Sequence, residues 1–579
     1  MHSVIKAIFF VTILLTSLHS QVDISNQFSI RYGDGDIKLS ELFFTDRLPD
    51  DYNYREIYLD TRLSLNKGPY RLESMFAFEV SDPPEIGLEI DSLREFLFGV
   101  YHNNFSLEIG DVYQTWGRGL ILNQLDYQNL DFDTGSRGIG IQFRDSFKTL
   151  NIIMGKTNNR ESTTVLGNYN PRIPNYFVEQ NIYGADISVN IVKSNIGAAL
   201  LLVDEKERFL NHTLANFRLE RPYKDGEFFL SMINKISEKE PNGPDTFYSR
   251  KDGGGMYVSN TNYLKNWALT SSYRKFTIDV NDPISRDNIV DNYGQALDIQ
   301  RSPSGFYQHT FRLLSRQSNE VNLNDEIGIE IQLLGPINDK SNMSINYMKS
   351  SSSKSWNNID GDWSGSNHFF MPSSNQDSYP FEELFIEFDG YNSKGDIFYK
   401  FGIDFQDQVF SVLSNSDEVK SFELKKSLTL PMLLSFSMNP LWNVEVQLEL
   451  QKLKTGFDTG IFSEVDQQIN SNFYSLLSEE CQENIFLSLS AQYNQKWSFN
   501  VSHESTNSDE SLLNEGEDDS FDSSNDWNSF SVAYNFESDH MLEFFYGSIR
   551  GGLDCTNGVC RYIQAFDDGI RIDYSRNFN

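Results

Sequence analysis

Carboxylates crowd one polar stretch of the chain, residues 505–526. This stretch has no Lys or Arg, and its acidic residues are Asp509, Glu510, Glu515, Glu517, Asp518, Asp519, Asp522 and Asp526. Clustered carboxylates can hold calcium, which takes six to eight oxygen ligands. Their spacing does not fit the EF-hand pattern. We therefore interpret the stretch as a solvated acidic loop, with calcium as the alternative, and predict no other cofactor.

The chain has three cysteines, and two of them enclose a turn signal. Cys555 and Cys560 lie on either side of the pair Asn557-Gly558, which favours a tight turn. Cysteines that face each other across a hairpin tip lie within disulfide reach, and an exported chain folds in an oxidising compartment. We predict a Cys555–Cys560 disulfide rather than a zinc site, because no further ligands with suitable spacing lie nearby. Cys481 stays outside this pair.

A third segment, residues 114–137, combines apolar and charged side chains. The residues that we consider for a constriction are Trp116, Arg118, Asp126, Asp131, Asp133 and Arg137. Apolar side chains such as Leu120, Ile121 and Leu122 are poorly suited to a loop in water. We therefore predict that the segment folds back, either into a lumen as a constriction or against the rim of the protein, and the two alternatives stay open.

No catalytic motif accompanies these segments. The histidines after residue 20 are His102, His212, His309, His368, His503 and His540. None lies in an H-E-x-x-H pattern, and the chain has no G-x-S-x-G or P-loop sequence. The formal net charge of −34 opposes binding to nucleic acid or to an anionic lipid surface. We predict neither an enzyme nor a nucleic-acid partner.

The elements that position these segments are strands with alternating apolar and polar residues. Clear examples are residues 327–333, 396–405, 442–451 and 485–493. Segments of about ten residues are long enough to cross a bilayer as tilted strands. Turn residues mark short connections at 66–68, 103–104, 392–395 and 537–539. Long polar connections are expected at 33–53, 114–137, 157–177, 237–253, 351–380 and 505–526.

Short and long connections alternate along most of the chain, which is typical of outer-membrane barrels with short periplasmic turns and long external loops. The alternation is ambiguous between residues 419 and 483, where we assign strands to 419–438 and 441–453. This gives an all-β fold, a single transmembrane antiparallel barrel of about 26 strands, within a range of 24–28. A soluble β-sandwich array or a propeller does not require such alternation, and no fixed repeat is visible.

The two ends of the chain agree with this fold. Residues 7–18 form an apolar run behind Lys6, which predicts a signal peptide at 1–20 and a barrel at 21–579. No later run of eighteen apolar residues is present, so we predict no transmembrane helix. At the other end, residues 569–578 alternate strictly and close on Phe578, as expected of the strand that seals a barrel.

Two sequence signatures carry a family resemblance. The first is Gly110-Asp111-Val112-Tyr113 with Trp116-Gly117-Arg118-Gly119-Leu120, closing at Arg137-Gly138. The second runs from Phe544 to Leu553 and continues through Cys555, Cys560 and Arg561-Tyr562. Both are similar to the ends of an uncharacterised family of large outer-membrane barrels from Gram-negative bacteria. The resemblance implies a barrel in the cell outer membrane and no particular chemistry.

These observations give two functional hypotheses. The first is a channel or receptor for polar or cationic solutes, whose specificity depends on an acidic lumen and on the 114–137 segment. The alternative is a non-conducting surface scaffold or binding protein with a plugged lumen. In either case the expected partners are outer-membrane lipid, lipopolysaccharide and the barrel insertion machinery. The oligomeric state is not predicted.

Overall fold

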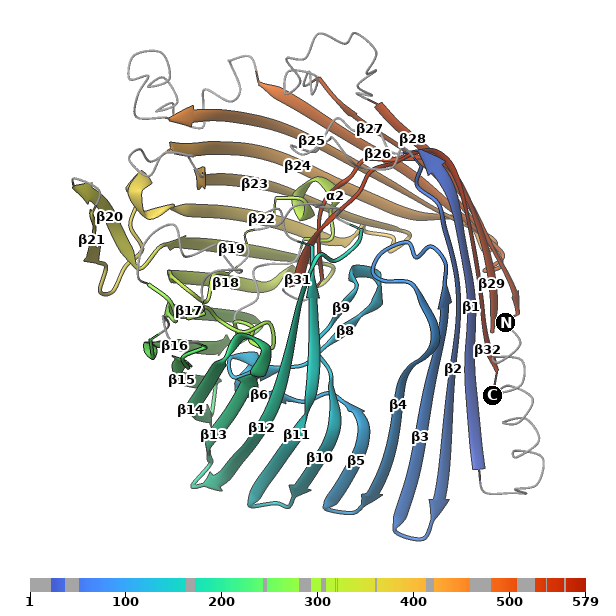
Figure 1. Cartoon of the computed structure of the whole chain (residues 1–579). Coiled ribbons are helices and arrows are strands. Elements are labelled where there is room, and N and C mark those ends of the chain that lie inside the picture. Colours follow the sequence, from blue (N-terminus) through green and yellow to red (C-terminus); the bar gives the residue numbers. More distant parts are fainter. Residues whose placement is uncertain are drawn as a thin grey trace.

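The computed structural model describes residues 22–36, 51–162, 172–242, 247–280, 293–303, 309–317, 319, 321–359, 362–412, 421–458, 481–507, 526–537, 539–556 and 559–578. Its main sheet has 24 antiparallel strands. The sheet is a closed barrel, because β1 (Val22–Asp36) pairs with β32 (Phe566–Phe578) as well as with β2 (Tyr54–Lys67) (Figure 1). Closure pairs the backbone of the first and last strands, so the sheet has no free edge.

The remaining strands of the barrel follow one another around the wall in chain order. They are β3 (Tyr70–Ser81), β4 (Ile90–His102), β5 (Phe105–Val112), β10 (Ser136–Arg144), β11 (Lys148–Glu161), β12 (Tyr176–Ile191), β13 (Ser194–Glu205), β14 (Leu210–Tyr223), β15 (Gly226–Lys239), β16 (Ser249–Leu264), β17 (Trp267–Thr277), β18 (Glu326–Asn338), β19 (Ser341–Ser351), β22 (Phe381–Tyr391), β23 (Ile397–Val412), β24 (Ser421–Asn439), β25 (Trp442–Asp458), β26 (Gln482–Tyr493), β27 (Trp497–Thr506), β28 (Asp526–Glu537) and β29 (His540–Ile549).

The predicted fold class is confirmed, and the strand count of 24 is at the lower end of the predicted range. Our preferred number of 26 was two too high. Several short extended segments pair locally and stay outside the barrel sheet. They are β6 (Thr115–Trp116) with β7 (Leu122–Asn123), β8 (Asp126–Tyr127) with β9 (Phe132–Asp133), β20 (Lys354–Ile359) with β21 (Asp362–Asn367), and β30 (Gly552–Thr556) with β31 (Val559–Ile563). The pairs β6–β7, β8–β9 and β20–β21 lie within the long connections expected at 114–137 and 351–380.

Connection lengths differ between the two ends of the barrel. At one end the strands are joined by tight turns, such as residues 68–69, 103–104 and 265–266. The first residue of β1 and the last residue of β32 lie at this same end, as the strand directions require. The other end has most of the long connections, although residues 206–209, which contain η4 (Lys206–Arg208), form a short one there.

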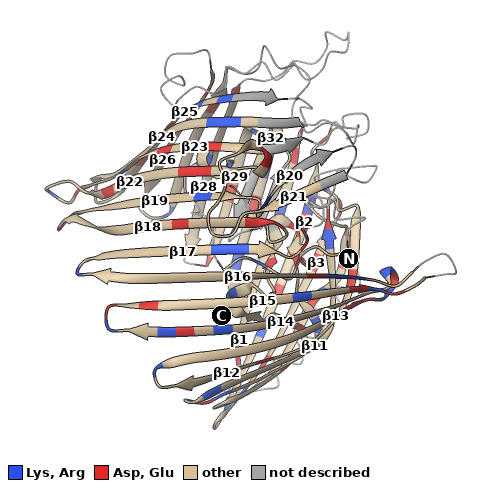
Figure 2. Ribbon diagram, turned by 90° about the vertical axis from the view of Figure 1, so that its left-hand side faces the viewer, with Lys and Arg blue, Asp and Glu red and all other residues tan. Residues whose placement is uncertain are grey.

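The two faces of the wall differ in polarity. On β12, β13 and β14 the outward side chains Ile187, Leu200 and Phe217 are 47%, 49% and 46% exposed. Inward neighbours such as Gln180 and Asp186 are buried. Charged residues occupy only short parts of the strands, and most of the wall is tan (Figure 2). An exposed apolar belt of this extent is not stable in water and requires an apolar surrounding.

Two long connections enter the barrel instead of extending away from it. We call residues 113–135 the first inward segment, and residues 293–303 and 309–325, apart from 318 and 320, the second inward segment. Figure 1 shows their short elements β6, β8, β9 and α2 (Arg312–Ser315) inside the ring of strands. Among the described residues, no helix has the length and apolar character needed to span a bilayer.

Candidate functional site

The first inward segment is a chain of very short elements. It contains β6 (Thr115–Trp116), η2 (Gly117–Gly119), β7 (Leu122–Asn123), β8 (Asp126–Tyr127), η3 (Gln128–Leu130) and β9 (Phe132–Asp133), with β6 paired to β7 and β8 paired to β9. The frequent turns follow from its glycines, because Gly117 and Gly119 both have positive φ. These turns fold a long connection into a compact unit that fits within the lumen.

An apolar cluster fixes this unit to the wall. Leu120, Ile121 and Leu122 are fully buried. The inward-facing residues that share their cluster are Ile153, Ile182, Leu201, Leu214, Phe229, Tyr257 and Phe276, from the consecutive strands β11 to β17. The segment therefore packs against the inner wall, and burial of three large aliphatic side chains contributes about 1.5–3 kcal/mol each.

The six constriction candidates lie in two separate places. Trp116 is buried over Gly184 of β12, where a larger residue would collide with the indole ring. Arg118 forms ion pairs with Glu220 of β14, at 3.1 Å, and Glu227 of β15, at 2.5 Å, and its guanidinium lies 3.8 Å from the Phe229 ring centroid. These two residues belong to the β12–β15 side of the lumen.

The other four candidates gather near β3, β4 and β5. Asp126 accepts a hydrogen bond from Arg94 at 3.2 Å, and Asp131 lies 4.0 Å from Arg160. Asp133 accepts from the Tyr113 hydroxyl at 3.1 Å and from the Gly135 N–H at 2.8 Å. Burial raises the pKa of Asp133.

Arg137 is part of the wall itself. It pairs with Asp111 on the neighbouring strand at 3.0 Å and donates to the carbonyl of Arg94 at 2.9 Å. The sequence therefore identified residues of the inward segment, but they do not form one ring.

A bulge explains the acidic group around Arg94, which the sequence analysis did not single out. The register between β3 and β4 shifts so that Ala77 faces Glu95 while Phe78 faces Leu93. Arg94 is the extra residue, and the bulge brings its side chain to the lumen beside that of Glu95. There it forms ion pairs with Glu95, with Asp126 at 3.2 Å and with Glu79 at 3.6 Å.

The N-terminal signature of the sequence supports this bulge. Asp111 accepts a hydrogen bond from the Phe96 N–H at 2.8 Å, next to the bulge, and pairs with Arg137. Gly110 and Gly138 face each other in the register, and a Cβ atom on Gly138 would lie 2.0 Å from the carbonyl oxygen of Met154. Glycine is thus required by close strand packing, and this part of the signature has a structural role.

The second inward segment lies on the first. The Asn123 N–H donates to the Ile299 carbonyl at 2.6 Å, and the Arg301 N–H donates to the Gly119 carbonyl at 2.9 Å. Gln300 donates through its side chain to the Leu120 carbonyl at 3.0 Å. Ile299 also joins the apolar cluster. The two segments form one body on the β11–β17 side of the lumen.

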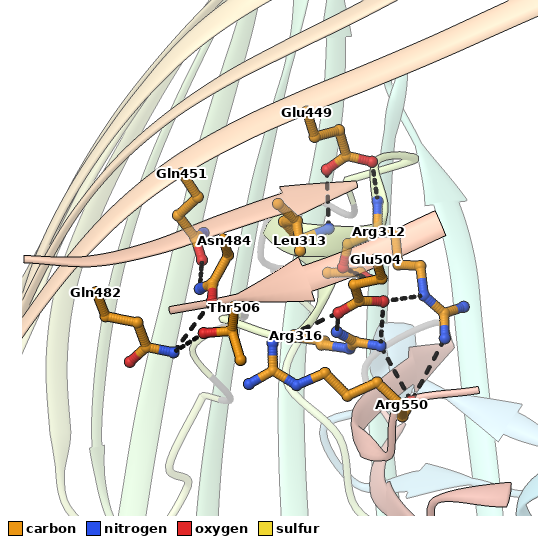
Figure 3. Close-up of polar contacts among 11 residues, drawn as sticks. Arg312, Leu313, Arg316, Glu449, Gln451, Gln482, Asn484, Glu504, Thr506 and Arg550 are labelled. Carbon is orange, nitrogen blue, oxygen red and sulfur yellow. Dashed lines mark hydrogen bonds and ion pairs between the residues drawn. The ribbon is translucent and has the colours of Figure 1, made fainter. Parts of the chain in front are cut away.

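The second segment then continues to the opposite side, where charge holds it. Glu449 of β25 accepts hydrogen bonds from the backbone N–H groups of Arg312 and Leu313, both at 2.8 Å, and so caps α2 (Figure 3). Glu504 of β27 pairs with Arg312 at 3.2 Å and with Arg316. Together these contacts form a buried ionic anchor.

Arg550, which follows β29, completes the anchor. Its side chain lies 3.5 Å from Glu504, and its carbonyl oxygen accepts from Arg316 at 3.0 Å (Figure 3). Burial lowers the pKa of Arg312. Three guanidinium groups thus meet one carboxylate at a site where β30 also contacts α2. Sequence reasoning missed this group, because its members come from four distant parts of the chain.

Open space remains beside the first inward segment. A polar cavity of about 220 Å³ lies where the segment leaves the wall, and its lining residues include Glu108, Tyr113, Gln114, Gln142 and Asn151. A cavity of this volume and polarity can hold several water molecules.

Three sequence-based predictions are not tested by the described structure. The register places Cys555 opposite Cys560 in the β30–β31 hairpin, and the disulfide stays a prediction. The acidic stretch with its calcium alternative lies mostly outside the described residues, since 508–525 are not described. The expected signal peptide at 1–20 also lies outside them.

Comparisons with known proteins give a family. Residues 85–578 match the Family of unknown function (DUF6029). A search of the curated proteins returns no match.

Among solved structures, the chain is similar to the siderophore receptor PirA from Pseudomonas aeruginosa, with 7% identity and a TM-score of 0.39 over 96% of this chain and 80% of that one. It is similar to the copper transporter OprC, with 11% identity and a TM-score of 0.44 over 97% and 81% of the two chains. It is also similar to the translocation pore of the P pilus usher PapC, with 7% identity and a TM-score of 0.39 over 96% of this chain and 99% of that one.

Proposed function

The chain belongs to the Family of unknown function (DUF6029), and on that premise we propose that it is an outer-membrane barrel for uptake of polar or cationic solutes, gated by its own second inward segment. An outer-membrane location is supported by the outward apolar belt. It is also supported by wall closure, which leaves no strand edge unpaired in lipid. In this arrangement the tight turns are periplasmic, the long connections face outward, and lipid, lipopolysaccharide and the insertion machinery are the partners.

The observation that carries the gating proposal is the contrast between the two anchors. The first inward segment is held by a large apolar cluster, whereas α2 is held by carboxylates and guanidinium groups together with a smaller apolar cluster of Phe311, Leu314 and Phe385. Apolar packing is insensitive to charge, but a buried ion pair is lost when one partner changes its charge or geometry. We therefore assign the first segment to a permanent lining and the second to the moving part.

The balance of buried acidic and basic side chains supports cations as solutes. Among the described residues, fifteen Asp and Glu side chains are buried, against three Lys and Arg. Half-buried arginines such as Arg94 and Arg316 compensate some of these carboxylates. The remaining negative potential favours cations over anions along the inner wall.

The second candidate function is a non-conducting scaffold, which the occupied lumen also favours. Planar-bilayer recording separates the two. We expect small, rare openings for the wild type and longer, cation-selective openings for the double variant Glu449→Gln, Glu504→Gln, which removes both carboxylates from the anchor. Glu227→Gln, which weakens only the exposed pair with Arg118, is the matched control and should behave as the wild type.

A folded double variant that stays electrically silent would support the scaffold and contradict the channel. The location has its own test, because recovery of the mature protein in the soluble periplasmic fraction would contradict a barrel in the outer membrane.

A further inference from the structure

Three buried side chains converge where the second inward segment contacts β22 and β23. His309 Nε2 lies 2.7 Å from Glu383 Oε1, and Asp404 is the third member. One donor atom from each lies within 4.8 Å of the other two, and all three residues are buried. Gln406 donates to the same Glu383 oxygen at 3.2 Å, which fixes the orientation of that carboxylate.

The charges of this group are not balanced by the protein around it. Asp404 is fully buried, and neither of its carboxylate oxygens has a hydrogen-bond partner. Within the described part of the chain, no Lys or Arg forms an ion pair with Glu383 or Asp404. Lys400, on the same strand as Asp404, is paired with Glu387 at 3.1 Å. It is also four residues from Asp404, or about 13 Å along an extended strand.

Two adjacent carboxylates in a buried site require a cation or a shared proton, because their mutual repulsion and desolvation are otherwise uncompensated. A protonated His309 supplies one positive charge against two negative ones. A divalent cation with a neutral imidazole balances the site fully.

We propose that His309, Glu383 and Asp404 form a binding site for a divalent transition-metal ion of the zinc class. An imidazole nitrogen with two carboxylates suits zinc and its neighbours, whereas calcium and magnesium prefer ligand sets made only of oxygen. Zinc–ligand bonds of about 2.0–2.2 Å place tetrahedral donors roughly 3.4 Å apart, so the three donors need only small side-chain movements. A water molecule or Gln406 is available for the fourth position.

The position gives the ion a structural consequence. His309 precedes α2 in the second inward segment, while Glu383 and Asp404 belong to the wall. The rings of His309 and Phe385 also meet in a T-shaped arrangement, with centroids 4.7 Å apart. A bound ion joins the segment to β22 and β23, in addition to the anchor on β25 and β27. The site itself does not rest on the proposed transport function.

Metal binding is tested on the purified full-length barrel in detergent. The protein is treated with a chelator, desalted, incubated with Zn²⁺ alone, desalted again and analysed for zinc by mass spectrometry. Isothermal titration with Zn²⁺ gives the affinity, and Co²⁺ substitution reports an imidazole–carboxylate site through its visible absorption. The variants are His309→Gln and Asp404→Asn, which preserve side-chain size.

His212→Gln is the matched control, because His212 is also a buried histidine beside a carboxylate, Glu205, at 3.4 Å. We expect one zinc per barrel for the wild type and the control. His309→Gln and Asp404→Asn should each lose more affinity than the roughly 10–100-fold that follows from changing a residue that only supports a ligand. Circular dichroism confirms that each variant is folded.

Retention of zinc by either folded variant, or absence of stoichiometric zinc from the wild type, would overturn the proposal. If the wild type holds no zinc, Asp404→Asn tests the alternative, in which Glu383 and Asp404 share a proton. A neutral amide at that position then preserves or raises the stability of the barrel.

Discussion

Replacing Glu504 by Gln should release α2 from the barrel wall without disturbing the first inward segment. The carboxylate of Glu504 is buried and is contacted by Arg312 at 3.2 Å, by Arg316 and by Arg550 at 3.5 Å. Glutamine has nearly the same shape but no charge, and its amide N–H₂ faces groups that are themselves donors. Three guanidinium groups then share one neutral acceptor.

The size of the effect follows from this geometry. Removing one partner of a buried ion pair costs about 3–5 kcal/mol, because the other partner stays buried without compensation. Glutamine keeps one carbonyl acceptor, and Arg312 is 37% exposed, so part of the cost is recovered through solvent. We take the lower value of about 3 kcal/mol, which shifts the ratio of released to docked segment roughly 100-fold at 1.36 kcal/mol per factor of ten.

Hydrogen exchange with mass spectrometry measures this ratio directly. The reporting amides are Arg312 and Leu313, which donate to Glu449, and Gln317, which donates to the Leu314 carbonyl at 3.0 Å. In Glu504→Gln their exchange should accelerate roughly 100-fold through local opening. Peptides containing Asn123, whose N–H donates to Ile299, serve as the internal reference and should keep wild-type protection. Unchanged exchange at residues 312–317 in the folded variant would show that Glu504 does not hold the segment.

Three further predictions concern the lining, its acidic group and the last hairpin. Ile121→Ala removes a fully buried side chain and should lower the free energy of unfolding in urea by about 2–5 kcal/mol. The outward Leu202→Ala should cost less, because Leu202 is 44% exposed, and equal costs would contradict the packing described. Burial raises the pKa of Asp133 above its ordinary value of 3.8, so its contribution to stability is lost as the pH rises through the folded-state pKa. Asp133→Asn should therefore flatten the decline in stability as the pH rises above 3.8, and an identical pH slope would count against burial as the cause. In the unreduced protein, the peptide between Arg550 and Arg561 should be two hydrogens lighter than its sequence mass. Replacing Cys555 and Cys560 by Ser should cost about 2 kcal/mol for so small a ring, and a free-thiol count of three would disprove the disulfide.

The strands of this barrel were predictable because each residue meets one of two environments. In β13, outward Leu200 and Leu202 and inward Leu201 and Val203 are all apolar. Burial alternates along this strand, but apolar and polar residues do not. Most strands nevertheless keep the period of two, and turn residues mark their tight connections. The count was two too high, and the connection between β17 and β18, residues 278–325, was not among the long connections expected from the sequence.

The lumen was less predictable, because its groups come from distant parts of the chain. Arg94 faces inward only because one extra residue enters β4, and an insertion of one residue leaves no mark in the sequence. His309, Glu383 and Asp404 meet across three elements, and no spacing rule connects them. Residues 114–137 were recognisable because their apolar side chains conflict with an exposed loop, which is a local signal.

The apolar inner surface of β13 indicates where a solute path can lie. Leu201 and Val203 face the lumen, which is unfavourable in a water-filled channel, and both are buried in the cluster with the first inward segment. Withdrawing that segment would expose apolar wall across β11–β17, at about 25 cal/mol for each square ångström. On the other side, release of α2 exposes Glu449, Glu504 and their arginines, which water solvates readily, and an apolar cluster smaller than the first. In the proposed channel, the less costly opening is therefore on the side of β22–β29, which carries the charged residues of the anchor.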